Sequence, residues 1–414
     1  MRRVLLTGLL ILCGACGGTS SPSYLFLWAG DADQKASDFL AVIDANPTSL
    51  HYGTIVASIQ TGVAGSHPHH TEHEMPTNGH LLANGFHAGR TWLFDLARPL
   101  QPRILTSFDD VAGYSHPHTF IRLADGHVLT TFQYQAGLGA SLHESEHDPT
   151  THTIEHSIGG LVEMDERGRP FRSGSASDAA IEDKRIYPYS VLPMPAVDRA
   201  VSTTTDMDQA DTGQTSNWLQ FWRLSDLTLL RSIALKPGPR GDENRLTGEP
   251  RLLPDGQSVY IHTFTCGLYL LRGVDRVEPT ISFVRGFEGV DCGVPILTGH
   301  YWLQTVSEAH ALIALDIADP EHPREASRVT VGDDERPHWI SIDPTGRRIV
   351  LNSGGYAKGN RLFLVNFDPA GGNLSVDEQF RDADSLRAGI NLTGKMWPHG
   401  FGGTVVPHGT VFSR

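Results

Sequence analysis

Length, composition and charge narrow the possible classes of this 414-residue chain. It carries 43 Gly and 25 Pro among many short apolar runs, which is typical of an all-β chain rich in turns. The formal net charge of −14 and the lack of a Lys/Arg cluster argue against a nucleic-acid groove, so we expect no nucleic-acid partner.

The first 15 residues have the pattern of an export signal. Arg2 and Arg3 precede an apolar run, 4–12, that is too short to span a bilayer. Small residues then precede Cys16, as in bacterial lipoprotein signals, which predicts cleavage before Cys16 and acylation of its thiol. Plain secretion with cleavage near Ala15 is the alternative. No second apolar segment follows, so we expect a periplasmic protein, or an outer-membrane lipoprotein that touches the membrane only through its lipid.

A repeat of roughly 40 to 60 residues runs along the rest of the chain. Its first half is a hairpin pattern with a Gly turn between apolar runs, as in "EMPTNGHLLANGF" (74–86) and "ISIDPTGRRIVLNSG" (340–354). Its second half is a strand that ends at an acidic or Pro turn, as in "TWLFDLARPLQPR" (91–103). Such units predict four-stranded sheets arranged as the blades of a propeller.

The count of repeats predicts how the ring closes. Seven second halves occur, but only six hairpins precede them, and the missing hairpin is predicted at the C-terminus, over 399–414. A ring that takes strands from both termini explains this mismatch, whereas a pair of β-sandwiches would not need it. We therefore expect an all-β, seven-bladed β-propeller over 36–414, closed by strands from both termini. Residues 16–35 would form an exposed tether and the start of the first blade.

Two cysteines remain beside Cys16 once the signal is set aside. They are Cys266 and Cys292. In an oxidising compartment they could pair as a disulfide, and two buried free thiols are the alternative.

Histidines recur where the chain leads into the first strand of a repeat. This strand lines the central channel of a propeller, so side chains at its start face one mouth of the channel. Four of the seven segments carry a histidine near a proline: His70 (beside His69), His118, His338 and His399. Neutral imidazoles on rigid strands suit Cu, Zn or Fe, which predicts a metal site. The alternative is a channel filled by polar side chains that hydrogen-bond water.

Other polar residues are candidates for the edge of this site. His310 precedes an inner strand of the sixth blade and reaches either the channel or the surface. His116 shares "SHPH" with His118, and strand alternation puts both on one face, where His116 would orient a ligand. Glu249 stands at the corresponding place in the fifth repeat, where it would orient a ligand or act as a base.

The remaining histidines of the two richest segments are predicted to lie outside the site. His67 and His73 are expected in loops, and His80 follows a turn at the far end of its hairpin. The second histidine-rich segment, 141–156, is acidic and polar, which indicates a solvated loop.

At these residues the chain resembles the selenium-binding protein family, whose characterised enzymes are methanethiol oxidases. The resemblance spans about 39–412 and rests on "FLAVIDANPTSLHYGTIV", "HTFIRLADGHVLTT", "HALIALDIADPEHPR" and "ISIDPTGRRIVLNS". It also includes the His69-His70 pair and the "PHG" of His399. The resemblance implies a seven-bladed propeller with copper held by histidines that match His69, His70, His118, His310 and His399; His338 rests on the repeat alone.

The resemblance also implies the reaction. Members oxidise methanethiol with O2 and water to formaldehyde, hydrogen sulfide and hydrogen peroxide, so a small thiol and O2 would be the partners. His70, His118 and His399 would then be catalytic. The cysteine proposed to bind selenium in animal members has no equivalent, because the stretch here reads "HYGTIVAS" with Gly53.

Two other functions fit the sequence. One is a non-catalytic metal-binding propeller that uses the same histidines, and the other is a surface scaffold that binds protein or glycan without metal. A lactonase-type propeller is disfavoured because no acidic cluster precedes the inner strands.

Overall fold

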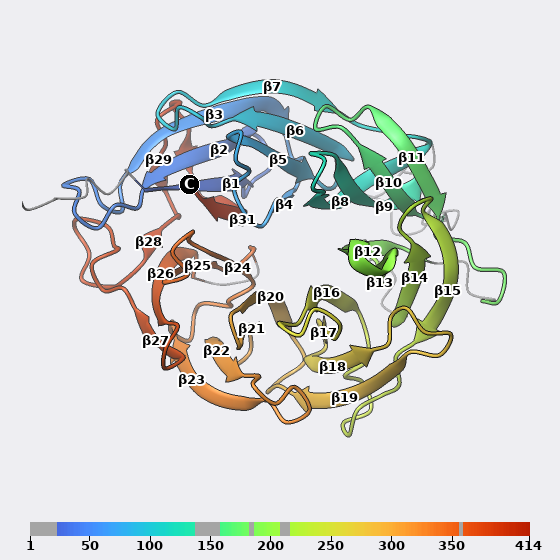
Figure 1. Ribbon diagram of the computed structural model, residues 1–414. Coiled ribbons are helices and arrows are strands. Elements are labelled where there is room, and N and C mark those ends of the chain that lie inside the picture. The colour runs from blue at the N-terminus through green and yellow to red at the C-terminus, as the bar shows by residue number, and fades with distance from the viewer. Residues whose placement is uncertain (1–22, 137–157, 182–185, 208–215, 356–358) are drawn as a thin grey trace, which may run out of the picture.

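Seven β-sheets stand around a common axis and form a closed ring (Figure 1). This computed structural model describes residues 23–136, 158–181, 186–207, 216–355 and 359–414. The predicted all-β, seven-bladed propeller is therefore confirmed. The predicted export signal, the Cys16 acylation site and the segment 141–156 lie outside the described residues. Within the described ranges, no helix is long and apolar enough to cross a membrane.

Six blades consist of consecutive strands, and in each the first strand is the innermost, next to the first strands of the neighbouring blades. In chain order the strands are β4 (Pro68–Thr71), β5 (His80–Gly85), β6 (Arg90–Asp95) and β7 (Arg103–Phe108); β8 (Tyr114–Arg122), β9 (Val128–Gln135), β10 (Gly160–Met164) and β11 (Pro170–Ser175); β12 (Pro188–Met194), β13 (Arg199–Thr204), β14 (Trp218–Arg223) and β15 (Thr228–Ala234), with the short 3₁₀ turn η2 (Pro195–Val197) between β12 and β13; β16 (Thr247–Leu252), β17 (Val259–Thr263), β18 (Gly267–Arg272) and β19 (Thr280–Gly286); β20 (Cys292–Thr298), β21 (Tyr301–Val306), β22 (Ala311–Asp316) and β23 (Arg324–Thr330); and β24 (Trp339–Ile342), β25 (Arg348–Asn352), β26 (Arg361–Asp368) and β27 (Asn373–Val376), with β28 (Ile390–Asn391) beside β26.

The remaining blade joins the two ends of the chain. Its order is β3 (Ile55–Ala64), β2 (Ser37–Asp44), β1 (Tyr24–Asp31) and β31 (Val405–Phe412), with β31 innermost. Closure by both termini was predicted, but the division of strands was not. The C-terminus contributes one strand rather than a hairpin, and the segment 16–35, predicted as a tether and the start of the first blade, contains the buried strand β1. Because β1 is buried on both faces, its sequence "YLFLWAGD" has no alternation that would mark it as a strand.

A small separate hairpin overlaps the start of the predicted C-terminal hairpin segment, and β31 occupies most of the rest. The small hairpin pairs β29 (Lys395–Met396) with β30 (Gly402–Gly403), and His399 lies in its loop. Only after this hairpin does the chain enter the centre of the ring as β31.

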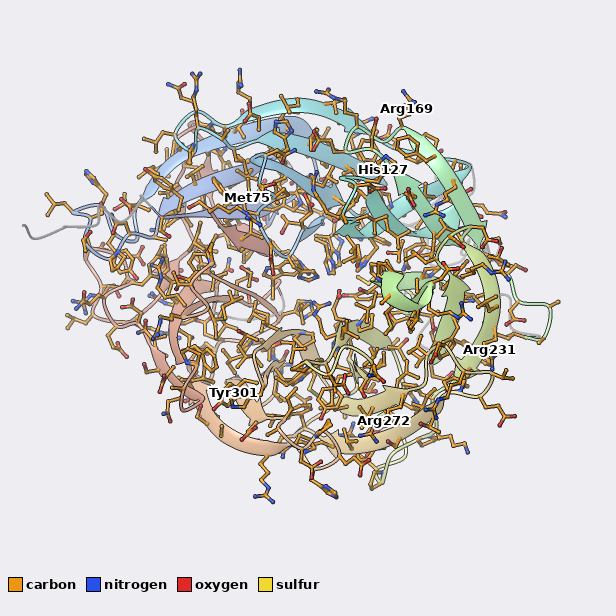
Figure 2. All side chains as sticks on the ribbon, in the orientation of Figure 1. Met75, His127, Arg169, Arg231, Arg272 and Tyr301 are labelled. Carbon is orange, nitrogen blue, oxygen red and sulfur yellow. A yellow bond between two sulfur atoms is a disulfide. The ribbon has the colours of Figure 1, made fainter. Side chains whose placement is uncertain are left out.

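Apolar side chains fill the layers between neighbouring blades. Trp28 on β1 contacts Trp92 and Phe94 on β6, with ring centroids 5.4 and 5.7 Å apart. The outer strands carry exposed polar residues, and Figure 2 shows Arg169 and Arg231 at the outer edge of the ring. The inner strands are thus held in place by cores on both sides, which makes them a rigid support for a site.

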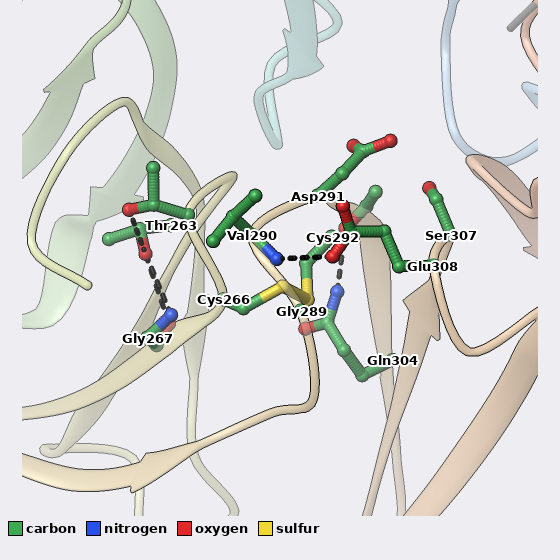
Figure 3. The surroundings of a disulfide bond; sticks show 12 residues. Thr263, Cys266, Gly267, Gly289, Val290, Asp291, Cys292, Gln304, Ser307 and Glu308 are labelled. Carbon is green, nitrogen blue, oxygen red and sulfur yellow. Dashed lines mark hydrogen bonds between the residues drawn. A yellow bond between two sulfur atoms is a disulfide. The ribbon is translucent and has the colours of Figure 1, made fainter. Parts of the chain in front are cut away.

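A disulfide joins Cys266 to Cys292 (Figure 3). Cys266 lies in the turn between β17 and β18, and Cys292 begins β20 of the next blade. The bond therefore ties two adjacent blades together. Of the two alternatives that the sequence left open, the structure has the disulfide and not the pair of free thiols.

Candidate metal centre

Three neighbouring inner strands bring four histidines together at the centre of the ring. His69 and His70 lie on β4, His118 lies on β8, and His408 lies on β31. All four side chains are buried. The ring of His69 lies 4.5 Å from that of His70, 4.9 Å from that of His118 and 4.0 Å from that of His408. The rings of His70 and His118 lie 4.1 Å apart.

Interrupted strand pairing explains why these residues point toward one another. The register of β4 shifts between Pro68 and Thr71, and the register of β8 shifts between Pro117 and Phe120. A proline cannot donate to the ladder, and such a bulge changes the direction of the side chains that follow. The consecutive residues His69 and His70 can therefore stack, with ring planes only 6° apart, instead of pointing to opposite faces.

Asn84 on β5 links the two strands that carry most of the cluster. Its Oδ1 accepts from the backbone N–H of His70 at 2.7 Å, and its Nδ2 donates to the carbonyl of Pro117 at 2.5 Å. The amide side chain thus replaces ladder bonds that the bulges remove, and it sets the spacing between His70 and His118.

Gly409 allows the third strand to approach. A Cβ at this position would lie 2.6 Å from the backbone nitrogen of Thr71 and 2.9 Å from the carbonyl oxygen of His69. Only a residue without a side chain fits such a contact. The backbones of β31 and β4 therefore lie close enough for His408 to contact His69.

The ring nitrogens of the cluster are arranged as metal ligands are. One nitrogen from each of His69, His70 and His118 lies within 4.8 Å of the others. Nδ1 of His118 donates to the carbonyl of Tyr189 at 2.8 Å, since a carbonyl only accepts, and this leaves the lone pair on Nε2. Among the described residues, His118 Nε2, His69 Nδ1 and His70 Nδ1 are buried and have no hydrogen-bond partner. Buried polar atoms without a partner are rare in folded proteins, which indicates a ligand.

Burial keeps these imidazoles neutral, the form that binds metals. It lowers the pKa of His118 to about 4. Burial, together with the neighbouring histidines, lowers the pKa of His69, His70 and His408 well below the ordinary value. The cluster is therefore ready to bind a metal at neutral pH without first losing protons.

Two predicted site residues lie elsewhere than expected. His399 lies outside the centre of the ring: its Nδ1 is 2.7 Å from Ser58 Oγ on β3, the outermost strand of its blade, and its ring packs against Phe39 at 4.6 Å. His310 lies in the β21–β22 turn, where its Nδ1 donates to the carbonyl of Glu335 at 2.6 Å. The structure thus brings neither residue to the cluster. His310 leads into β22 and His399 leads into β30, and neither of these is the innermost strand of a blade.

Two other predicted residues lie close to the cluster. His338 precedes β24, is buried, and has its ring 5.1 Å from that of His408. His116 is also buried, but it has a φ of 58° and its ring contacts Phe86 and Tyr134. The alternation that was expected to align His116 with His118 does not apply, since the register of β8 shifts between Pro117 and Phe120.

His408 is the site residue that the sequence analysis missed. It follows Pro407 directly, just as His118 follows Pro117 and His399 follows Pro398. The same signal was therefore present twice near the C-terminus, and only strand order distinguishes the two copies.

A second group of possible ligands adjoins the first. His70, His73 and Glu249 place ligand atoms within 4.8 Å of one another. Glu249 was predicted near the site and is fully buried on β16. His73 was expected in a loop. It does follow β4, but its ring lies 6.1 Å from that of His70 and stacks on Trp339 at 5.0 Å.

Cavities lie on both sides of the cluster. One of about 840 Å³ lies where the inner strands end, and His73, Arg122 and Arg251 line it. Another of about 390 Å³ lies where the inner strands begin, and His67 and Asp38 line it. His73 neighbours His70, and the ring of His67 lies 5.5 Å from that of His69. A histidine next to the cluster thus lines each cavity.

Known proteins share both the sequence pattern and the fold. No protein-family profile matches the chain. A methanethiol oxidase from Hyphomicrobium sp is 24% identical over 357 residues, 81% of this chain and 76% of that protein. The structure of a hypothetical selenium-binding protein from Sulfolobus tokodaii matches with a TM-score of 0.71 at 16% identity, over 95% of this chain and 94% of that one.

A propeller of another function is also similar. The periplasmic gluconolactonase of Pseudomonas aeruginosa has a TM-score of 0.61 at 12% identity, over 95% of this chain and 99% of that one. At such identities the structural likeness shows the fold alone. The sequence match to the oxidase adds what the fold cannot, and it agrees with the resemblance seen in the motifs. The chain is therefore distantly similar in sequence to a methanethiol oxidase and shares its fold with a selenium-binding protein.

Proposed function

We propose that the protein is an exported, copper-dependent oxidase of methanethiol or a related small thiol. The observation that carries the proposal is the set of three buried histidines that place one ring nitrogen each within 4.8 Å of the others, and each of the three also has a buried nitrogen without a hydrogen-bond partner among the described residues. The sequence relative named methanethiol oxidase supports the substrate class. Export rests on the N-terminal sequence pattern, with the acylated Cys16 as the expected anchor in the outer membrane.

The residues present fit copper. His69, His70 and His118 would hold the ion, and His408 packs against His69 beside them. Several neutral imidazoles on rigid strands form a donor set that copper accepts, and zinc accepts it too. Bound copper would supply a position for a soft thiolate and electron exchange with O2, chemistry that protein side chains lack.

The residues around the histidines make the site small and dry. Trp339, Tyr189 and Phe86 surround the cluster, with ring centroids 4.9 Å from His70, 4.0 Å from His118 and 5.9 Å from His69. Aromatic walls exclude water and favour a small apolar substrate such as a one-carbon thiol. In such surroundings the charge of a thiolate interacts more strongly with nearby charges than it does in water.

Tyr189 has two roles in orienting the histidines. Its carbonyl accepts from His118 Nδ1 and thereby selects the tautomer with a free Nε2. Its hydroxyl lies 3.2 Å from His70 Nε2, where the two groups can share one proton. The backbone and the side chain of one residue thus orient two of the proposed ligands.

The proposal is tested by metal content and by O2 uptake. The untagged full-length chain is loaded with copper, desalted and analysed by mass spectrometry, beside His118→Ala and the control His80→Ala. His80 is a suitable control because it pairs with Glu166 at 2.8 Å and lies outside the cluster. We expect tightly held copper in the wild type and the control, its loss in His118→Ala, and methanethiol-dependent O2 uptake that releases sulfide and hydrogen peroxide in equal amounts.

Two results would contradict the proposal. Copper that His118→Ala retains would place the metal elsewhere than in the cluster. Copper in the cluster without thiol-dependent O2 uptake would instead support a metal-binding propeller that is not an oxidase.

A further inference from the structure

Glu249 is a buried carboxylate that the proposed oxidase does not use. It is fully buried on β16. Its Oε2 accepts from Ser190 Oγ at 2.6 Å and from Arg251 Nη1 at 2.8 Å. Its Oε1 is buried and has no hydrogen-bond partner in the part of the chain that the structure describes. Oε2 thus accepts two hydrogen bonds, whereas Oε1 of the same carboxylate accepts none from the described residues.

Near this oxygen lies a nitrogen that also has no hydrogen-bond partner among the described residues. Nε2 of His73 lies 3.6 Å from Glu249 Oε1. That distance exceeds the ordinary range of about 2.7–3.2 Å for a hydrogen bond. Two ligands bound tetrahedrally to one ion at about 2.0–2.1 Å lie about 3.4 Å apart. The spacing is therefore closer to that of two ligands of one ion than to that of a hydrogen-bonded pair.

A third donor completes the set. The ligand atoms of His70, His73 and Glu249 all lie within 4.8 Å of one another. We propose that these three residues form a second divalent-metal position beside the histidine cluster. His70 belongs to both groups, and its imidazole binds both ions at once only after its N–H proton is lost to solvent, when each ring nitrogen carries a lone pair. This position goes beyond the proposed oxidase and does not require that activity.

The donor set indicates which ion the second position takes. Two imidazoles and one carboxylate suit Zn²⁺ or Fe²⁺, whereas the all-imidazole cluster lacks a hard oxygen donor. Burial tends to raise the pKa of the Glu249 carboxyl, but the charge of Arg251 outweighs it and holds that pKa below the ordinary value. The carboxylate is therefore ionised at neutral pH. Ser190 and Arg251 bond its other oxygen, as partners of metal-bound carboxylates commonly do.

One of the three proposed ligands borders a cavity. His73 lines the cavity of about 840 Å³ at the end of the inner strands. Its stacking on Trp339, with ring planes 6° apart, holds the imidazole at the boundary between the cavity and Glu249. An ion can thus enter from this side, which any metal site requires.

The test measures zinc in protein that already holds copper. The untagged full-length chain is loaded with copper, then with Zn²⁺, desalted, and analysed for both metals by mass spectrometry. His73→Gln and Glu249→Gln are compared with the wild type. Two matched controls are His80→Gln and Glu72→Gln; Glu72 is also buried and paired with an arginine, at 2.7 Å from Arg122. Histidines elsewhere bind equally in all these proteins, so the difference between proteins is the readout.

We expect each of His73→Gln and Glu249→Gln to lose about one zinc per chain and to keep its copper. Equal zinc in the wild type and both variants would overturn the proposal. Loss of copper together with zinc would also overturn it, because the two groups would then be one site. If Glu249→Gln does not fold, His73→Gln at the cavity wall decides alone. The proposed function fails on separate observations, namely copper in His118→Ala and thiol-dependent O2 uptake.

Discussion

The tripeptide Pro-His-Gly occurs twice near the C-terminus, and the two copies have different surroundings. In the first copy, His399 lies in the loop of the β29–β30 hairpin and contacts Ser58 on an outer strand. In the second copy, His408 lies on the innermost strand β31, with its ring 4.0 Å from that of His69. Identical local chemistry therefore gives one histidine at the edge of a blade and one in the candidate metal centre.

The difference lies in what the neighbouring glycine touches. A Cβ at Gly400 would meet nothing within 4 Å, although its φ is +92°. A Cβ at Gly409 would meet the backbone of β4. The first glycine thus serves a turn, and the second serves a close approach of two strands. The position of a Pro-His-Gly histidine therefore depends on the strand or loop in which the motif lies.

Replacing the two histidines should have the largest and most unequal effect. We expect His408→Ala to weaken copper binding by about tenfold or more, the loss typical when a residue beside metal ligands is removed. His399→Ala should keep wild-type affinity, since its contacts are with Phe39 and Ser58. Copper titration with a competing chelator measures both. Weaker binding in His399→Ala alone would favour the prediction made from the sequence.

Replacing the two glycines should distinguish the energetic cost of a steric clash between two strands from the cost of a positive φ. We expect Gly409→Ala to lower the free energy of unfolding by about 3 kcal/mol, because the new methyl group has no space against β4. Gly400→Ala should cost only about 1 kcal/mol, the effect of a positive φ without a clash. Denaturant unfolding gives both values. Equal losses would mean that β31 can move away from β4 freely.

Removing the partner of His399 should have the smallest effect. Ser58→Ala deletes one half-exposed hydrogen bond, the 2.7 Å contact with His399 Nδ1, so we expect a loss of about 1 kcal/mol or less. Copper content should not change. A change in copper content in this variant would show that the edge of the blade and the centre of the ring are coupled.

Much of the fold could be predicted from the sequence. The Gly-turn hairpins and the mismatch in repeat number indicated seven blades and closure by both termini, and the structure has both. The strand β1 lies in the segment expected to contain a tether and the start of the first blade, but its bounds were not predicted, since a strand buried on both faces shows no period of two. The C-terminal hairpin was misplaced for a related reason: the sequence does not show which of two successive segments pairs with β1.

The candidate site could be predicted in part. His69, His70 and His118 were singled out because each stands near a proline at the start of an inner strand, and the structure brings them together. His408 and His73 were missed, and His310 and His399 were included, because inclusion depended on position within the repeat. The bulges that redirect the side chains, and the stacking of His73 on Trp339, depend on partners far away in the chain.

The sequence by itself determined the architecture, the supply of histidines and the prolines that interrupt the inner strands. These properties are local, because turns, strand periods and missing N–H donors act within a few residues. Only the tertiary structure decided which histidines meet, which nitrogens lose their partners and which carboxylate is left half bonded. Those outcomes depend on burial and on contacts between strands from different blades, and neither is written in any one segment of the chain.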